Sequence, residues 1–385
     1  MSTKHIIQRI QSVIGPCEQF TPLHIPIFDE LEVANLRECV ESNFVSSVGA
    51  FCDRFEAALC DYTGAKRAVL CVNGTAALHL ALRVVGVQPG DEVLIPSLSF
   101  VATSNAVSYA GAIPHFIDVE PNHFGMCPQA LKARLEEVAE TRDGQLINRE
   151  TKRPIRCAVP MHAFGHPVML KELLEVTRAY GLLLVEDAAE SLGSFYQDKH
   201  TGTFGDCGII SFNGNKIITT GGGGVLLFND DALADKAKYL STTAKRPHKW
   251  EFFHDELGYN YRMPALNAAL GCAQMDKLSG FVEQKRELAS RYAEAFAELE
   301  GLRFVTEPEG CRSNYWLNTL VLDKDGPFER DAVLDATNSA NIMTRPVWHP
   351  LHDLPMYATC PRGDLAITKS LARRILNIPS TASLI

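Results

Sequence analysis

Short apolar stretches alternate with longer segments of helical periodicity through the first half of the chain. Residues 92–95, for example, form an apolar run that ends at Pro96, and an amphipathic pattern follows over residues 100–109. Strands that alternate with helices are typical of a mainly parallel sheet with helices on both faces, so the pattern predicts an α/β fold. The predicted strands are 68–72, 92–95, 113–119, 155–160, 182–186 and 208–212, and the predicted helices are 76–85, 100–109, 128–142 and 170–180.

The pattern changes near Pro264. Two long amphipathic helices are predicted at 265–278 and 282–299, followed by a strand at 317–322 and a helix at 328–339. A chain of 385 residues is long enough for more than one core. We therefore expect three parts: an N-terminal segment (1–30), a large ligand-binding domain (31–263) and a smaller C-terminal α+β domain (264–385).

Composition and charge narrow the functional classes. The chain is 46% hydrophobic and 22% charged, with a net charge of −9 and no long block of like charges, which disfavours nucleic acid as a partner. It contains no apolar run long enough to span a membrane, and the first residues lack the pattern of a signal peptide. The eleven cysteines are scattered without any CxxC pair, which predicts reduced thiols, no metal site and a cytoplasmic protein.

Lys216 is the strongest candidate for chemistry. It lies in a turn-rich segment between a predicted strand and the glycine run Gly221–Gly224, with no acidic residue from Phe212 to Phe228. Burial lowers the proton affinity of a lysine amine, which then becomes the nucleophile that a Schiff-base enzyme requires. The alternative interpretation is a solvated lysine in a polar hairpin loop.

Other candidates follow strand ends, where ligands bind in parallel sheets. Asn73-Gly74-Thr75, with Thr75 as the N-cap, could bind a phosphate at a helix N-terminus or simply cap that helix. Asp187 ends a buried strand and needs a partner, such as a protonated pyridine nitrogen; a metal-ligand or capping role is the alternative. Phe100 could stack on a flat ligand or belong to the core. His162 and His166 either line the same site or are structural.

Taken together in this order, the motifs resemble the DegT/DnrJ/EryC1/StrS sugar aminotransferases, which are fold-type I pyridoxal phosphate enzymes. The motifs that carry the resemblance are Phe44–Gly49, Asn73-Gly-Thr-Ala-Ala-Leu-His-Leu80, Glu186-Asp-Ala-Ala-Glu190, Ser211-Phe-Asn-Gly-Asn-Lys216 and Gly258-Tyr-Asn-Tyr-Arg-Met263. The resemblance implies a Schiff base with pyridoxal 5′-phosphate at Lys216, pairing of Asp187 with the pyridine nitrogen, and Glu190 on the side of the ring hydroxyl. It also implies phosphate contacts from Gly74, Thr75 and Ser211, stacking by Phe100, and a homodimer with shared active sites in which Asn260 reaches the cofactor phosphate of the neighbouring subunit.

Within this family, four segments resemble the enzymes of bacillosamine and legionaminic acid synthesis. These segments are Phe44–Gly49, Ser194–Tyr196, Asn213–Thr220 and Thr344–Trp348. The resemblance implies transfer of an amino group from glutamate to C4 of a nucleotide-linked 4-keto-6-deoxy-N-acetylhexosamine. A UDP-linked sugar is favoured, but the sequence alone does not distinguish UDP from GDP. Candidates for the sugar site are Ser46, Ser47, Arg345, Trp348 and His349.

Several alternatives stay open at this point. A 3-aminotransferase or a perosamine-type 4-aminotransferase would keep every cofactor residue, and a cofactor-binding sensor of sugar nucleotides would bind without turnover. The family's sugar dehydratases carry histidine in place of the lysine, so Lys216 disfavours them. A nicotinamide oxidoreductase is disfavoured because the chain lacks the glycine fingerprint after its first strand.

Overall fold

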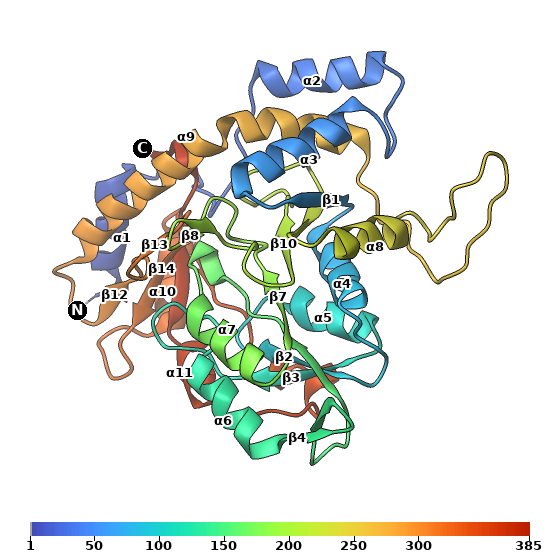
Figure 1. Cartoon of the computed structure of the whole chain (residues 1–385). Coiled ribbons are helices and arrows are strands. Elements are labelled where there is room, and N and C mark those ends of the chain that lie inside the picture. The colour runs from blue at the N-terminus through green and yellow to red at the C-terminus, as the bar shows by residue number, and fades with distance from the viewer. Residues whose placement is uncertain (1) are drawn as a thin grey trace.

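A seven-stranded sheet lies at the centre of the computed structural model, which describes residues 2–385 (Figure 1). Its strand order is β1-β11-β10-β7-β6-β2-β3, and every neighbouring pair is parallel except the two pairs made by β11. The predicted mainly parallel α/β sheet is therefore confirmed. The strands are β1 (Arg67–Cys71), β2 (Glu92–Pro96), β3 (Ile113–Ile117), β6 (Ile155–Ala158), β7 (Leu183–Asp187), β10 (Cys207–Ser211) and β11 (Gly224–Phe228).

Helices cover both faces because successive side chains of a strand point to opposite sides. In β11, Leu226 packs in the cluster beneath one layer of helices, whereas Val225 packs in the cluster beneath the other. The first layer contains α4 (Gly74–Val84), α5 (Val101–Tyr109) and α8 (Asp231–Ser241). The opposite layer contains α3 (Ala50–Thr63), α6 (Pro128–Val138), α7 (Leu170–Ala179) and the first part of α9 (Ala265–Phe296). This arrangement leaves the carboxyl ends of the parallel strands open to form a site.

The last third of the chain builds a second sheet, which is antiparallel throughout, with the order β12-β14-β16-β15. Ile6 and Ile10 of α1 (Thr3–Ile14) pack into the same core as Tyr292 of α9 and Leu320 of β14. Its elements are β12 (Leu302–Phe304), β14 (Asn318–Leu322), α10 (Arg330–Ser339), β15 (Arg345–Pro346), α11 (Ala366–Leu371) and β16 (Ile375–Ile378). The division at residues 30 and 263 stays a prediction, and the first helix packs with the C-terminal elements.

The remaining elements are short, apart from α2 (Glu30–Glu41), which lies outside α3 and α9 (Figure 1). They are β4 (Ala139–Arg142), β5 (Gln145–Asn148), β8 (Phe195–Tyr196), β9 (Lys199–His200), β13 (Cys311–Arg312), and the 3-10 helices η1 (Ala163–Gly165), η2 (Leu351–Asp353), η3 (Pro355–Tyr357) and η4 (Ala382–Leu384). Within residues 2–385, no helix combines the length and the apolar character needed to cross a membrane.

Two helix predictions were wrong. The two helices predicted at 265–278 and 282–299 are one helix, α9, because Leu278, Phe281 and Val282 stay buried in a single core across the Ser279-Gly280 interruption. The helix predicted over 128–142 ends at Val138, where the chain enters the β4–β5 hairpin. In both cases tertiary contacts outweigh local propensity.

Two glycines of α9 give a matched test of this packing. An alanine Cβ at Gly271 would lie 2.6 Å from ring atoms of buried Phe55, whereas at Gly280 it would meet nothing within 4 Å. We expect Gly271→Ala to lower the free energy of unfolding by about 1–3 kcal/mol through overpacking. Gly280→Ala should raise it by up to about 1 kcal/mol, because alanine favours the helix. Urea denaturation measures both, and equal effects would contradict this account of α9.

Candidate active site

The segment that carries Lys216 connects the antiparallel strands β10 and β11. Its base is closed by hydrogen bonds from the Phe212 N–H to the Gly223 carbonyl (2.9 Å) and from the Thr220 N–H to the Phe212 carbonyl (3.1 Å). The side-chain amide of Asn267, on α9, donates to the carbonyls of Thr220 and Gly222. The predicted glycine run therefore forms the returning arm of a fixed loop, which brings Lys216 back over the sheet.

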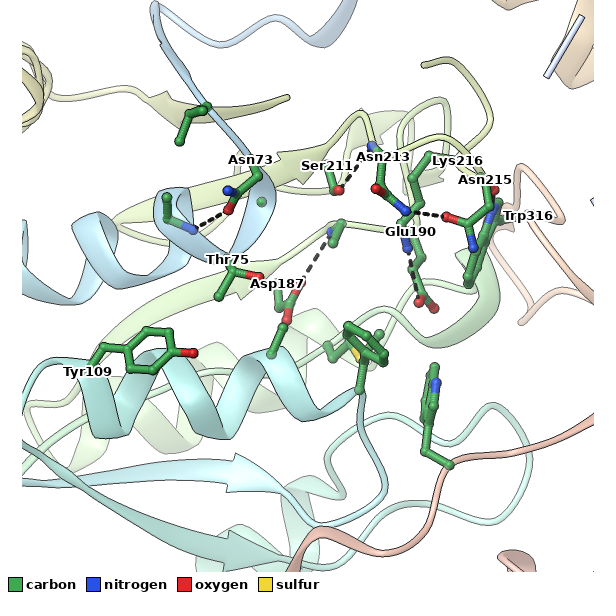
Figure 2. A pocket seen from close by; sticks show the side chains of 18 of the residues that line it. Asn73, Thr75, Tyr109, Asp187, Glu190, Ser211, Asn213, Asn215, Lys216 and Trp316 are labelled. Atoms are coloured by element: carbon green, nitrogen blue, oxygen red, sulfur yellow. Dashed lines mark hydrogen bonds and ion pairs between the residues drawn. The ribbon is translucent and has the colours of Figure 1, made fainter. Parts of the chain in front are cut away.

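A cavity of about 710 Å³ lies over the carboxyl ends of the strands (Figure 2). The structure brings together eight of the predicted residues on its wall: Gly74, Thr75, Phe100, Asp187, Glu190, Ser211, Lys216 and Trp348. The wall also includes Asn213, Asn215 and Tyr261, which belong to the quoted motifs. Three further lining residues, Tyr109, Met161 and Trp316, were not singled out from the sequence. The separate strand-end motifs therefore meet at one site.

Lys216 lies between a carboxylate and an aromatic ring. Its Nζ is 3.3 Å from Oε1 of Glu190 and 3.8 Å from the ring centre of Trp316, and only 12% of its side chain is exposed. Among residues 2–385, Glu190 supplies the one carboxylate within ion-pair distance of this amine. Oε2 of Glu190 also accepts from the N–H of Phe164 (2.9 Å). Burial raises the pKa of Glu190 to about 7, although Lys216 opposes the shift.

Asp187 ends β7 with a buried carboxylate whose hydrogen-bond donors, within residues 2–385, are all neutral. Oδ2 accepts from the hydroxyl of Thr103 on α5 (2.8 Å), and Oδ1 accepts from the N–H of Ala189 (3.3 Å). Burial raises the pKa of Asp187, and Thr103 and the more distant Lys216 only partly offset the shift. A protonated nitrogen placed against this carboxylate would supply the charged partner that it lacks.

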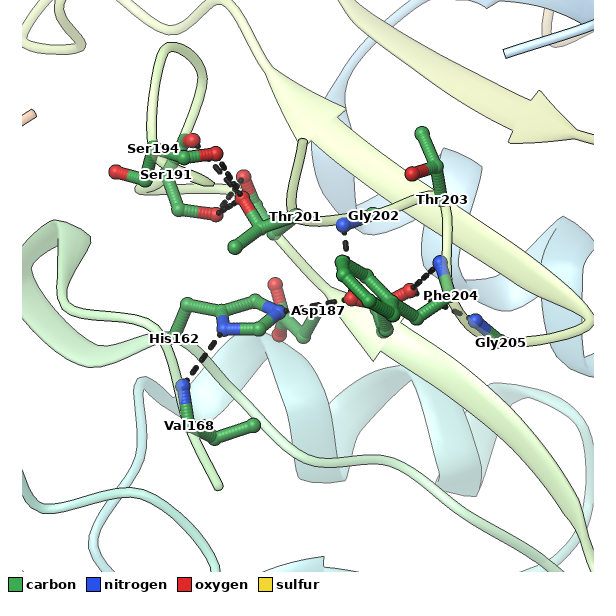
Figure 3. Close-up of polar contacts among 12 residues, drawn as sticks. His162, Val168, Asp187, Ser191, Ser194, Thr201, Gly202, Thr203, Phe204 and Gly205 are labelled. Atoms are coloured by element: carbon green, nitrogen blue, oxygen red, sulfur yellow. Dashed lines mark hydrogen bonds and ion pairs between the residues drawn. The ribbon is translucent and has the colours of Figure 1, made fainter. Parts of the chain in front are cut away.

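Glu186, the neighbour of Asp187, points to the other face of the sheet. Its Oε1 accepts from the N–H groups of Phe204 (2.6 Å) and Gly205 (2.8 Å), and its Oε2 accepts from Gly202 (2.8 Å). Nε2 of His162 lies 3.1 Å from the same Oε2 (Figure 3). Although burial opposes it, these donors hold the pKa of Glu186 below its ordinary value. His162 is thus structural.

The start of α4 presents free backbone donors. Asn73 is the N-cap, since its Oδ1 accepts from the Ala76 N–H (2.8 Å), so the prediction of Thr75 as the cap was wrong. This leaves the Thr75 hydroxyl on the cavity wall, and across residues 2–385 the N–H groups of Gly74 and Thr75 meet no acceptor. A Cβ at Gly74 would lie 2.8 Å from Cβ of Ser211, so glycine lets the two segments approach. Backbone donors, two hydroxyls and a helix dipole fit a phosphate.

Two aromatic side chains on the cavity wall, Phe100 and Trp348, lie near the buried ring of Phe164. Trp348 stacks on Phe164 with ring centres 5.0 Å apart and an interplanar angle of 24°, and Phe100 lies 6.4 Å away at a tilt. Phe164 occupies the left-handed region (φ 58°), uncommon for a residue other than glycine. His166 lies outside the cavity, where it packs edge-on against Tyr315, and is structural like His162.

Five predicted residues lie outside the cavity: Ser46, Ser47, Asn260, Arg345 and His349. Asn260 is exposed, and its Oδ1 accepts from Arg262 (3.3 Å). The Ser46 carbonyl accepts from the first N–H of α9, and Ser47 follows in the same surface loop. Arg345 is exposed on β15, and the adjacent candidate His349 also lies off the cavity wall. The predicted contact of Asn260 with a cofactor phosphate, and of the other residues with the sugar, stays a prediction.

Comparison with known proteins identifies the family and the fold. The sequence model of the DegT/DnrJ/EryC1/StrS aminotransferase family matches residues 26–385. The chain belongs to this family. It is 40% identical over 323 residues to EpsN of Bacillus subtilis, a relative named as a pyridoxal phosphate-dependent aminotransferase, and the match covers 84% of this chain and 80% of EpsN.

Two further similarities extend over almost the whole chain. The GDP-perosamine synthase of Caulobacter vibrioides is 38% identical over 362 residues, which cover 93% of this chain and 92% of the synthase. The crystal structure of the aminotransferase TlmJ from Streptoalloteichus hindustanus superposes with a TM-score of 0.84 at 29% identity, and covers 94% of both chains. This chain is therefore a pyridoxal phosphate-dependent sugar aminotransferase. Family membership implies a nucleotide-linked keto sugar and an amino donor as substrates.

The buried carboxylate of Glu190 gives a pH test. The carboxyl of Glu190 keeps its proton up to about pH 7 in the folded protein, whereas the ordinary pKa of a glutamate is 4.5. Between pH 4.5 and 7 the folded state therefore binds more protons than the unfolded state. The stability of the cofactor-free protein relative to Glu190→Gln should therefore fall, by on the order of 2 kcal/mol, as the pH rises from about 5 to about 8. Urea denaturation of both proteins measures the difference. Exposed Glu283→Gln is the control, and an unchanged difference for Glu190→Gln would contradict the raised pKa.

Proposed function

We propose that Lys216 carries the pyridoxal phosphate and moves the protons of the reaction. The observation that carries this proposal is the position of its amine, which lies beside Glu190 and over Trp316 in the cavity that also contains Asp187. When bound, the cofactor supplies an electron sink for negative charge at the reacting carbon. Nζ of Lys216 takes a proton from the α-carbon of the amino donor, and later returns one to the sugar carbon that is aminated.

The other cavity residues would hold the cofactor in register with this amine. Asp187 would pair with the pyridine nitrogen and keep it protonated, which is supported by its buried carboxylate without a charged partner. Glu190 would face the ring hydroxyl. Phe100 would stack on the ring, and the phosphate would bind at the start of α4 through Gly74 and Thr75, with Ser211 on the adjoining strand.

For the substrate, we propose C4 of a UDP-linked 4-keto-6-deoxy-N-acetylhexosamine, with glutamate as amino donor, for bacillosamine- or legionaminic-type surface sugars. The support is the set of sequence segments that resemble that branch, together with the ring of Trp348 on the cavity wall, which stacks on buried Phe164 and suits the apolar face of a sugar. A perosamine-type 4-aminotransferase acting on a GDP-linked sugar is the second candidate. The extended similarity to GDP-perosamine synthases favours it.

We also propose a homodimer with shared active sites. Asn260 is exposed and outside the cavity of its own chain, as expected of a residue that acts on a neighbour. A long projecting segment follows α8 (Figure 1), and Asn260 lies where the chain returns from it, in a β-bridge with Thr242. The side chains of Trp250, Phe252 and Leu257 on this segment are each more than 70% exposed, which favours burial against another surface.

The activity test uses a panel of nucleotide-linked keto sugars with glutamate, and 2-oxoglutarate as the readout. We expect turnover of the UDP-linked N-acetylated 4-keto sugar, and borohydride reduction should fix the cofactor to Lys216. Lys216→Ala should lose turnover by at least about 1,000-fold, since the amine both binds the cofactor and moves the proton. Lys238→Ala removes an exposed lysine paired with Glu56 and serves as the control. A fully active Lys216→Ala would refute the assignment, and exclusive turnover of the GDP-linked sugar would favour the second candidate.

Subunit complementation tests the shared site. Lys216→Ala and Asn260→Ala homodimers should each be nearly inactive, whereas a mixed dimer contains one site with both native residues. Unfolding and refolding an equal mixture should restore about a quarter of the activity, because half of the dimers are mixed and each has one intact site. An inactive mixture with demonstrated subunit exchange would show that both residues serve the same subunit.

A further inference from the structure

Trp316 contacts Lys216 and the backbone of the residue before it. The ring centre lies 3.8 Å from Nζ of Lys216, while the indole N–H donates to the carbonyl of Asn215 at 2.7 Å. A lysine side chain has four rotatable bonds, so contacts at both its root and its amine restrict it far more than either contact alone. One buried tryptophan thus supports both ends of the reactive side chain.

Trp316 is itself held through its backbone. Its N–H donates to Oδ1 of Asn314 (2.8 Å), and the amide of Asn314 donates to the carbonyls of Glu190 (2.9 Å) and Leu192 (2.8 Å). The short segment Asn314–Trp316, which precedes β14, therefore connects the loop of Glu190 with the loop of Lys216. These two residues form the ion pair of the site.

Behind Trp316 lies Lys285, a completely buried lysine of α9. Its Nζ donates to the carbonyl of Trp316 (3.1 Å) and to that of Ser380, and across residues 2–385 it forms no salt bridge. Burial lowers the pKa of Lys285 to about 7. A lysine in this environment is unfavourable unless its donors satisfy buried acceptors, and both of its acceptors are backbone carbonyls. Its contacts anchor Trp316 to α9 and to the segment that follows β16.

We propose that Trp316 is a positioning residue that fixes the amine of Lys216 over the cavity, and that Lys285 acts through Trp316. This inference rests on the proposed role of Lys216. Trp316 also lines the cavity, so the competing explanation is a purely structural wall. A positioning role predicts slower capture of the cofactor by the Lys216 amine without weaker binding in the cavity. A purely structural wall predicts that both are lost together.

The test follows how fast Lys216 captures the cofactor. The full-length protein is freed of cofactor, pyridoxal phosphate is added, samples are reduced with borohydride at intervals, and the Lys216 peptide is quantified by mass spectrometry. In parallel, the affinity for 4′-deoxypyridoxine 5′-phosphate, which lacks the aldehyde, reports on the cavity without the covalent bond. The variants are Trp316→Leu, Trp316→Phe and Lys285→Met, with Tyr315→Phe as the control. Tyr315 is the buried neighbour whose hydroxyl faces Glu307 rather than the cavity.

We expect Trp316→Leu to slow capture at least about tenfold, and Trp316→Phe, which keeps a ring beneath the amine, to slow it less. Lys285→Met should slow capture several-fold alone but add little in the Trp316→Leu background, because it acts through the same residue. Affinity for the deoxy analogue should change by less than about threefold. Unchanged capture in Trp316→Leu, or a parallel loss of capture and analogue affinity, would overturn the inference. Labelling of a lysine other than Lys216 in the unmodified protein would instead overturn the proposed function on which it rests.

Discussion

The geometry of the site depends on a carboxylate that does not line it. Glu186 is buried on the far face of β7 and requires four donors, three from the backbone at residues 202–205 and one from His162. An unsatisfied buried carboxylate would be too unfavourable to persist, so these donors must come together when the sheet forms. Because strand residues alternate in direction, fixing Glu186 also fixes Asp187 toward the cavity.

The same requirement explains why small residues surround this point. A Cβ at Gly205 would lie 2.4 Å from the carbonyl oxygen of Leu184, and one at Gly208 would lie 2.1 Å from that of Gly202. The backbone therefore packs directly on backbone around Glu186. Two acids in sequence serve opposite purposes: one organises the strand end, and the other is left without a charged partner for chemistry. Their pKa values accordingly shift in opposite directions.

The sequence is sufficient to predict those site residues whose place follows from their position next to a strand or helix. Lys216, Asp187 and the phosphate-type helix start follow strand ends, and the alternation of strands and helices was enough to place them on one edge. Thr103 and Trp316 could not be found in this way. Their importance comes from contacts with Asp187 and Asn215, which are 84 and 101 residues away in the chain. The unbroken α9 likewise reflects neighbours that only the folded chain supplies. The cap at Asn73 is different, because it is a local contact with the N–H of Ala76 and asparagine is a favoured N-cap residue, so local sequence was sufficient to predict it.

The continuity of α9 has a mechanical consequence. At about 1.5 Å per residue, its 32 residues extend for about 48 Å, and they carry both Asn267, which holds the glycine turn, and Lys285, which holds Trp316. A hinge needs residues whose backbone angles can change, and a continuous packed helix offers none. We therefore expect the glycine turn at the cavity and the second sheet to move together. Any opening that admits a bulky sugar nucleotide must come from the surface segments around the rim.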